Sequence, residues 1–156
     1  IFEALKKHPV FTTHLAAGAL QSPPPSGFFR KFLVEQDGAN KDNFDLKRRT
    51  LMPLTDAARV LILSHYTKGI NNTAARFEKL AAMESNNKEL YLACSYATKA
   101  LLKFRTKQGL VHNDSGRYID LNSLNKEEKM KLKRTFKTIK EIQALINIRF
   151  KVSQLL

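Results

Sequence analysis

Several residue types are scarce in this 156-residue chain, and each scarcity narrows what the chain can be. Its single cysteine, Cys94, excludes an internal disulfide and a multi-cysteine metal site, which fits a reducing compartment. No run of about 18 apolar residues occurs, so the sequence predicts no membrane span. No signal peptide is recognisable either. We therefore expect a cytoplasmic protein in which Cys94 is an inert core thiol.

Acidic residues are also few, because 14 Asp and Glu face 27 Lys and Arg. The resulting net charge of +13 favours polyanionic partners, such as nucleotide phosphates, nucleic acid, an anionic membrane surface or an acidic neighbouring domain. A solvated lysine-rich surface would give the same composition. Hydrophobic residues make up 43% and charged residues 26%, which is typical of a globular protein, and the length suits one domain over residues 1–156.

Apolar residues recur at helical spacing through most of the chain, which predicts helices over residues 1–20, 52–68, 73–83, 86–108 and 125–155. Pro9 should break or kink the first helix. Thr73 is the expected cap of the third helix, and Asn125 with Glu128 has the form of a capping box at the start of the last. Residues 109–121 are expected to form a loop.

The segment between the first two helices predicts a hairpin. Residues 22–27 are rich in proline and cannot continue a helix. Residues 28–34 and 43–47 look extended on either side of an Asp37-Gly38 turn, which gives a hairpin insertion over residues 28–48. The expected fold is therefore all-α, an antiparallel bundle of about five helices with a short β-hairpin insertion. Because the chain begins with Ile1 inside an apparent helix, we expect an excised part of a larger protein.

Several motifs, taken in their order and spacing, resemble a known family. They are Phe44-Asp-Leu-Lys47, Pro53-Leu-Thr-Asp-Ala-Ala-Arg59, Asn72-Thr-Ala-Ala-Arg76, Phe104-Arg105-x-x-Gln108, Leu132-Lys133-x-x-Phe136 and the Gln143…Arg149-Phe150 ending. Together they resemble the C-terminal helical domain, usually described as substrate-binding, of bacterial signal-transduction nucleotidyltransferases. In that family, cyclic-nucleotide-binding-like and CBS domains often precede the nucleotidyltransferase domain.

The resemblance implies an architecture similar to the helical domain of kanamycin nucleotidyltransferase-like enzymes, where a bundle closes the nucleotide cleft. It also implies upstream nucleotidyltransferase and CBS-type domains as partners, and Mg²⁺ with a nucleoside triphosphate for the full-length protein. The nucleotidyltransferase signature, a Gly-Ser turn followed by paired carboxylates, is absent from this sequence. Such transfer needs carboxylates to hold Mg²⁺ on the phosphates. The chain alone is therefore expected to be inactive, without a catalytic residue, a metal site or a cofactor of its own.

Five charged residues are the candidates for a nucleotide site or an interdomain contact: Asp45, Lys47, Asp56, Arg59 and Arg76. An arginine offers a planar fork to phosphate or carboxylate, although Asp56 and Arg59 could equally form a simple local helix pair. Arg76 lies in the first turn of its helix, where the dipole disfavours a cation, so Asp56 or a bound anion should compensate it.

A second polar set is expected to be structural. Arg105, Gln108 and Gln143 look like a polar layer inside the bundle, bonded to one another and to loop backbone. The four histidines show no metal-binding spacing, and His65 should be a core histidine.

Two alternatives remain open. One is a regulatory or oligomerising helical domain, such as a homodimer, without ligand binding; exposure of Leu145, Ile148 and Val152 would indicate its partner surface. The other is a nucleic-acid-binding module driven by the many lysines of the last helix. That interpretation lacks interleaved aromatic residues or a recognisable reading motif, so nucleic acid is the weaker candidate.

Overall fold

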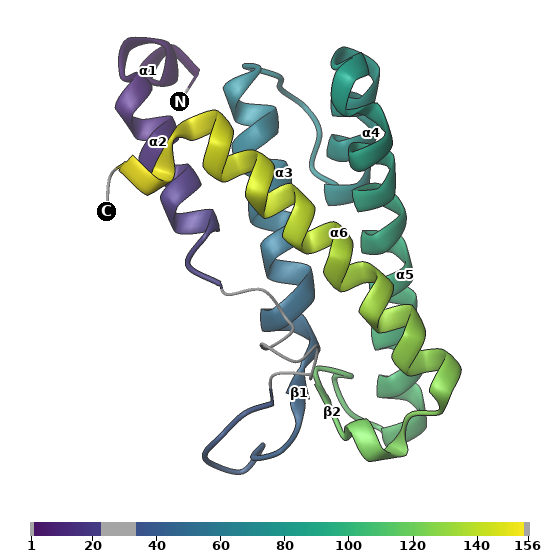
Figure 1. The fold of residues 1–156 in the computed structure, drawn as a ribbon. Coiled ribbons are helices and arrows are strands. Elements are labelled where there is room, and N and C mark those ends of the chain that lie inside the picture. Colours follow the sequence, from purple (N-terminus) through teal and green to yellow (C-terminus); the bar gives the residue numbers. More distant parts are fainter. Residues whose placement is uncertain (1, 23–33, 155–156) are drawn as a thin grey trace.

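The computed structural model describes residues 2–22 and 34–154, which form six α-helices and one pair of short strands (Figure 1). The helices are α1 (Phe2–Lys7), α2 (Pro9–Ala19), α3 (Met52–Ser64), α4 (Thr73–Met83), α5 (Lys88–His112) and α6 (Lys126–Phe150). The strands are β1 (Phe44–Asp45) and β2 (Tyr118–Ile119), which pair antiparallel. The expected all-α class with a small β component is confirmed.

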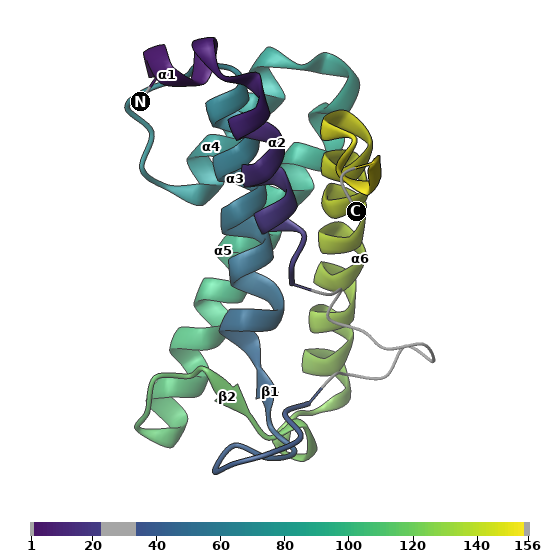
Figure 2. The same cartoon turned by 90° about the vertical axis from the view of Figure 1, so that its left-hand side faces the viewer.

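Helix α3 lies in the middle of the bundle and contacts α2, α4 and α6. Helix α4 packs along α5, and α6 crosses the front of α3 in Figure 1 while also contacting α2 and α5. Figure 2 shows the same bundle from the side, with α2 in front of the upper part of α3, α6 to the right of both and the strand pair at the end of the bundle away from α1. None of the described helices is long and apolar enough to cross a lipid bilayer.

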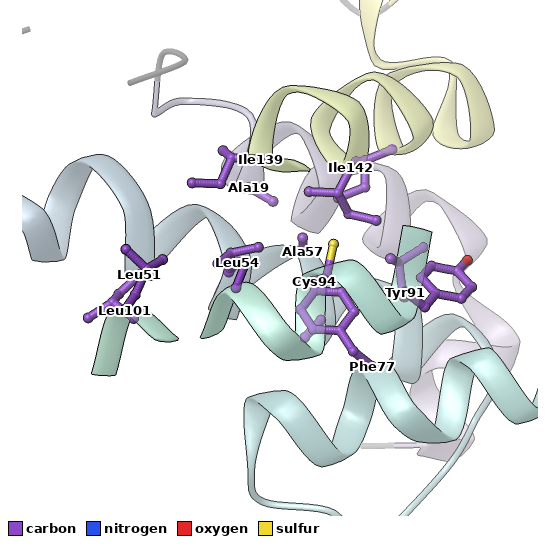
Figure 3. Packing of buried hydrophobic residues seen from close by; sticks show 14 of the residues in the cluster. Ala19, Leu51, Leu54, Ala57, Phe77, Tyr91, Cys94, Leu101, Ile139 and Ile142 are labelled. Carbon is purple, nitrogen blue, oxygen red and sulfur yellow. The ribbon is translucent and has the colours of Figure 1, made fainter. Parts of the chain in front are cut away.

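One continuous hydrophobic core joins helices α2 to α6 (Figure 3). Its largest fully buried side chains include Tyr91, Phe77, Leu54 and Ile142, which come from four different helices. The aromatic rings of Phe77 and Tyr91 stack with their centroids 6.5 Å apart. Cys94 lies in the same core, and burial raises the pKa of its thiol far above the usual value. The apolar spacing of α5 thus predicted its buried face correctly.

The start of α3 differs from the expectation. A π-helical turn over Lys47–Leu51 leads directly into α3, so Lys47 belongs to a helical turn and not to the end of a strand. The helix ends at Ser64, before the expected end near Lys68. Tyr66 follows it with φ of 51°, and Gly69 takes φ of 79° further on. The left-handed backbone at Tyr66 stops the helix before the glycine that the sequence suggested.

Helix α5 is longer than expected because it passes through Gly109. The loop that follows folds back onto this glycine. A Cβ atom there would lie 2.8 Å from the carbonyl oxygen of Asp114. Asn113 ends the helix in the left-handed conformation, with φ of 52°. Gly109 therefore serves close backbone packing rather than helix termination, and the loop begins later than predicted.

The strand pairing also differs from the expected hairpin. Phe44 and Asp45 pair with Ile119 and Tyr118, which the sequence placed in a loop. A turn does lie over residues 35–43, closed by hydrogen bonds from the Glu35 amide to the Asn43 carbonyl (2.9 Å) and from the Asp42 amide to the Glu35 carbonyl (2.9 Å). The expected first strand, residues 28–34, falls outside the described residues except for its last position.

Helix caps follow the sequence in one case and depart from it in another. The Asn125 side chain accepts from the Glu128 amide at 2.8 Å and Glu128 accepts from the Asn125 amide at 3.1 Å, which confirms the capping box of α6. At α4 the cap is Asn72, whose side chain accepts from the Ala75 amide at 3.0 Å, and not Thr73. Both are suitable capping residues, and the helix simply begins at Thr73 itself.

Candidate functional site

A groove runs between α3, the segment before α4 and the second half of α5. Its volume is about 580 Å³, within the roughly 300–1,000 Å³ typical of small-molecule sites. The residues that line it come from three stretches of sequence: Lys47, Leu51, Met52, Thr55, Asp56, Arg59, Asn71, Asn72, Thr73, Thr98, Leu102 and Arg105. We call this the cationic groove.

Three cationic side chains and one carboxylate line the groove: Lys47, Arg59, Arg105 and Asp56. The Nη1 atom of Arg59 lies 3.1 Å from Oδ1 of Asp56, and the Arg59 side chain stays 48% exposed. Burial raises the pKa of Asp56 above its ordinary value, although the charge of Arg59 opposes that shift. Asp56 is the sole acid among the described residues of the lining, so the groove keeps a surplus of positive charge.

Arg105 is held by the loop that follows its helix. Its Nε donates to the carbonyl oxygen of Ser115 at 3.0 Å. Its two terminal nitrogens have no partner among the residues that the structure describes. Arginine presents several donors in a rigid fork, so a guanidinium anchored through Nε still offers two nitrogens to an anion.

The N-terminus of α4 opens into the same groove. Asn72 satisfies the Ala75 amide, but the amides of Thr73 and Ala74 belong to the first turn and have no intrahelical acceptor. Unpaired amides and the helix dipole together favour an anion at this position. Three side-chain cations and a helix N-terminus thus meet in one groove, an arrangement suited to a phosphate-bearing ligand.

Not all of the predicted site residues lie in the groove. The structure brings Lys47, Asp56 and Arg59 together there. Asp45 lies elsewhere, 1% exposed, and its carboxylate accepts hydrogen bonds from Arg117 and from the Arg48 amide. Arg76 is also outside the groove. Its Nε donates to the Ile70 carbonyl at 2.8 Å, so a backbone oxygen compensates it in place of Asp56.

The expected polar layer of Arg105, Gln108 and Gln143 does not form. Arg105 bonds the 109–121 loop, as the sequence suggested for loop backbone, but Gln143 donates from Nε2 to the Ser22 carbonyl at 2.9 Å. Gln108 is 6% exposed. No hydrogen bond between any two of these three residues occurs in the described part of the chain. Arg105 lines the cationic groove and Gln143 lines a different one, so the three do not form one layer, although the expected bonds to loop backbone are present at Arg105 and Gln143.

Sequence reasoning missed Arg105 as a groove residue, although a signal was present. Thr98, Leu102 and Arg105 are spaced by four and three residues, so they share one face of α5, and all three line the groove. Each of the three directly follows a residue of the apolar stripe of α5, so they lie on the adjoining face of the helix.

A second charged cluster was missed altogether. Glu84 follows α4, and its carboxylate accepts two hydrogen bonds from Arg149, from Nη1 at 2.6 Å and from Nη2 at 2.7 Å. It also accepts from the Tyr91 hydroxyl at 2.7 Å and from Asn87 at 3.0 Å, and it contacts His65. The hydrogen bonds of this cluster connect the ends of α3, α4 and α6 to the start of α5. His65, expected in the core, is instead half-buried beside this carboxylate.

Hydrogen bonds set the protonation of this cluster. The bonds from Arg149 hold the pKa of Glu84 well below its usual range, burial opposes them, and those from Tyr91, Asn87 and His65 add to the lowering. Burial, with the neighbouring carboxylate, raises the pKa of Tyr91. Both carboxylate oxygens of Glu84 are thus engaged by protein groups, which indicates a structural joint rather than a binding site.

Helix α6 also carries many cations, some of which are paired along the helix. On α6, Lys131 pairs with Glu127 and Lys137 with Glu141, one helical turn away in each case. Of the three residues proposed for a partner surface, Ile148 is 76% exposed, Val152 is buried at 3% and Leu145 packs against the core. These three do not make one apolar surface. Among residues 2–22 and 34–154, no group of three metal-ligating side chains occurs.

Comparison with known proteins yields one family. The model of a family described as "Putative nucleotidyltransferase substrate binding domain" matches residues 9–150 of this chain. That match spans all of α2 to α6 and therefore the whole cationic groove. Neither the curated proteins nor the solved structures gave a match.

Proposed function

Because this chain belongs to the family of nucleotidyltransferase substrate-binding domains, we propose that its cationic groove binds the phosphate groups of a nucleotide substrate. Transfer of a nucleoside monophosphate needs positioned phosphates as well as a carboxylate-bound Mg²⁺. This chain has residues for the first task. We assign the second task to a catalytic domain upstream in the same protein, a proposal that rests on the sequence resemblance alone.

The observation that carries the proposal is the meeting of Lys47, Arg59 and Arg105 in one groove. They lie in a π-helical turn, in α3 and in α5, so only the folded chain brings them together. Like charges gathered at one place repel one another and lower stability unless an anion offsets them. Such a gathering beside a helix N-terminus supports a bound phosphate more than it supports a solvated surface.

Each of the three cations can contribute to phosphate binding in a different way. Arg59 is oriented by Asp56 and Arg105 by the Ser115 carbonyl, so both guanidinium groups are preorganised to bond phosphate oxygens. Lys47 is exposed, has no partner among the described residues, and contributes a mobile point charge. The amides at the start of α4 add further donors at one side of the groove.

The rim of the groove supports contact with another domain. Met52 is 41% exposed, Leu102 is 47% exposed and Leu110 is 79% exposed, and Leu102 and Arg105 are shared with the adjoining hollow beside the 109–115 segment. Exposed large apolar side chains around a charged hollow are typical of a surface that a partner covers. We propose that the catalytic domain packs on this rim and closes the nucleotide between the two domains.

The resemblance in sequence extends the proposal to regulation. On this hypothesis the polypeptide also carries CBS and cyclic-nucleotide-binding-like domains, and it transfers a nucleotide in response to a signal. The upstream sequence provides the check. A Gly-Ser turn with paired carboxylates ahead of residue 1 supports a nucleotidyltransferase, and its absence from the natural polypeptide contradicts that assignment.

The groove itself is tested by substitution in the polypeptide that carries both this chain and its catalytic domain. Arg59→Gln should weaken nucleoside triphosphate binding by about tenfold to a hundredfold, the value of one or two charge-assisted hydrogen bonds. Lys79→Gln is the matched control, because Lys79 is exposed on α4 and lies outside the groove. Unchanged affinity and unchanged transfer in the Arg59 variant would remove the proposed role.

A further inference from the structure

A second groove lies between α5 and α6 and differs from the cationic groove in character. Its lining is Ala93, Tyr96, Ala97, Ala100, Leu101, Phe104, Lys131, Leu132, Arg134, Thr135 and Thr138. The volume is about 230 Å³. Most of these side chains end in methyl groups or rings, and no carboxylate is among them. We call this the alanine groove.

Three alanines of α5 create the hollow. Ala93, Ala97 and Ala100 are spaced by four and three residues, so they form one stripe that faces α6. Larger side chains at these positions would fill the space between the two helices. Because apolar surface that faces water is unfavourable, a bound apolar group would stabilise an unfilled apolar groove.

Exposed side chains at the edge of the groove point to a polypeptide as the occupant. Tyr96 is 76% exposed, and Leu92, one turn earlier on α5, is 44% exposed. Tyrosine is enriched where proteins bind one another, because its ring buries a large area and its hydroxyl can still bond at the wet edge. An exposed tyrosine beside an apolar hollow therefore favours a protein contact.

Charge at the opposite edge specifies the chemistry of that occupant. Arg134 is exposed and without a partner in the described part of the chain, and Lys131, 67% exposed, is paired only with the exposed Glu127. Cations around an apolar floor are complementary to carboxylates that flank an apolar side chain. A second copy of this chain would bring a net charge of +13 to the same edge, which disfavours it as the occupant.

We propose that the alanine groove binds an amphipathic helix of another polypeptide, which inserts one large apolar side chain among the alanines and places carboxylates beside Arg134 and Lys131. The size fits one such side chain, because an apolar cavity of roughly 150 Å³ holds a benzene molecule and this groove is somewhat larger. A helix laid in a groove between two helices is a common mode of peptide recognition. The proposal does not depend on nucleotide binding in the cationic groove.

Helix-stabilised synthetic peptides provide the probe. An acidic peptide with Leu, Phe or Trp as its single anchor should shift the NMR signals of the methyl groups of Ala93, Ala97, Ala100 and Thr138. The same peptide with Ala in place of the anchor, or with Lys in place of the flanking Glu, should bind at least about tenfold more weakly, since each loses a main component of the contact.

Variants of the chain locate the binding. Ala100→Leu should fill the groove and abolish the shifts, and circular dichroism checks that this variant still folds. Arg134→Glu, at an exposed position, should weaken binding by at least about fivefold through repulsion of the acidic flanks. Lys79→Gln, at an exposed position outside both grooves, should leave peptide binding unchanged.

Three results would overturn the proposal. The first is that no anchored acidic peptide shifts the methyl signals of the groove. The second is equal binding of acidic and basic peptides, which would leave only non-specific apolar adhesion. The third is that these methyl signals shift with the concentration of the chain alone, which would show a second copy in the groove. The nucleotide assay on Arg59→Gln is unaffected by any of these outcomes.

Discussion

The guanidinium of Arg117 binds the carboxylate of Asp45, 72 residues earlier in the chain, with Nη2 2.7 Å from Oδ2 and Nε 3.1 Å from both oxygens. The same carboxylate accepts from the amide of Arg48 at 2.9 Å. It thereby connects β1, the end of the loop before β2 and the π-helical turn that carries Lys47 toward the cationic groove. A residue that the sequence suggested for substrate binding is thus part of the framework behind the groove.

Loss of this carboxylate should destabilise the fold. Burial raises the pKa of Asp45, but hydrogen bonds from Arg117 and Arg48 and their positive charges outweigh that effect, so the pKa stays below its ordinary value and the group is charged at neutral pH. Asp45→Asn should lower the free energy of unfolding by about 2–3 kcal/mol, because bonds to a charged group are lost at a buried site. Urea unfolding measures this.

The matched control for that substitution is Asp56→Asn. Its partner Arg59 is 48% exposed and three residues away on the same helix, so the pair should contribute only about 0.2–0.5 kcal/mol. Equal losses in the two variants would contradict the structural assignment of Asp45.

Glu84 should make stability fall with acid. Its pKa in the folded chain lies well below that of a free glutamate, which is about 4.3. A depressed carboxyl pKa contributes stability that is fully present above the unfolded pKa, and that contribution is lost as the pH falls toward the folded value. Below about pH 5 the unfolded chain takes up a proton that the folded chain does not, so the free energy of unfolding decreases.

Glu84→Gln isolates that contribution. The difference in unfolding free energy between the natural chain and the variant should be about 2–4 kcal/mol at pH 7, as for loss of one partner in a partly buried ion pair, and should shrink steadily below about pH 5. Chemical unfolding from pH 7 to pH 3 gives the curve. A difference that stays constant across this range would show that Arg149 does not hold the carboxylate as described.

Gly116 should be intolerant of any side chain. It has φ of 61°, and a Cβ atom there would overlap the Arg105 carbonyl oxygen, which is backbone and cannot move aside. Gly116→Ala should cost at least about 2 kcal/mol, through left-handed backbone strain and the forced retreat of the loop. Because that loop holds Arg105 through the Ser115 carbonyl, anion binding should weaken as well.

Gly18 provides the comparison for that glycine. It lies in α2, and a methyl group added to it would meet nothing within 4 Å. Gly18→Ala should therefore leave stability unchanged or raise it by up to about 1 kcal/mol through helix propensity. Thermal unfolding of both variants tests the pair. A neutral Gly116→Ala would mean that the loop does not pack against α5 as the structure has it.

Cys94 should be unreactive while the chain is folded. Its thiol is buried and its pKa is raised by burial and by the charge of Glu141, so almost no thiolate is present at neutral pH. A disulfide reagent should modify it at least about a hundredfold more slowly in buffer than in denaturant, since reaction requires opening of the core. Rapid modification of the folded chain would place the thiol outside the core.

The helices were predictable because each was encoded locally. Apolar spacing marked the buried faces of α3, α5 and α6, and the pair Asn125 and Glu128 fixed the start of α6 through bonds within one helical turn. Local signals of this kind need no knowledge of the rest of the chain. The fold class followed from them.

Features made by distant residues could not be predicted in the same way. The pairing of β1 with β2 is accompanied by the ion pair of Asp45 with Arg117, and the loop after α5 folds back so that Asp114 lies against Gly109. The sequence around each of these residues gives no indication of its distant partner. For the same reason the sequence suggested Asp56 as the partner of Arg76, whereas the folded chain supplies a carbonyl oxygen six residues away.

Only some of the residues that line the cationic groove could be predicted from the sequence. Lys47, Asp56 and Arg59 were recognised from one stretch of sequence, where their resemblance to a family motif could be seen. Arg105 was not, because its place in the groove depends on how α5 packs against the π-helical turn before α3 and on the bond to Ser115.

The most direct test of the cationic groove compares two triple variants of equal net charge. One replaces its three cations, as Lys47→Gln, Arg59→Gln and Arg105→Gln, and the other replaces exposed cations elsewhere, as Lys79→Gln, Lys126→Gln and Lys137→Gln. The measurement is the affinity of each for inorganic triphosphate by isothermal titration at low salt. The affinity for triphosphate should fall at least about thirtyfold in the groove variant and no more than a few fold in the control variant. The reason is that only the groove residues bond the anion directly. Equal losses in the two variants would contradict a phosphate site in the groove.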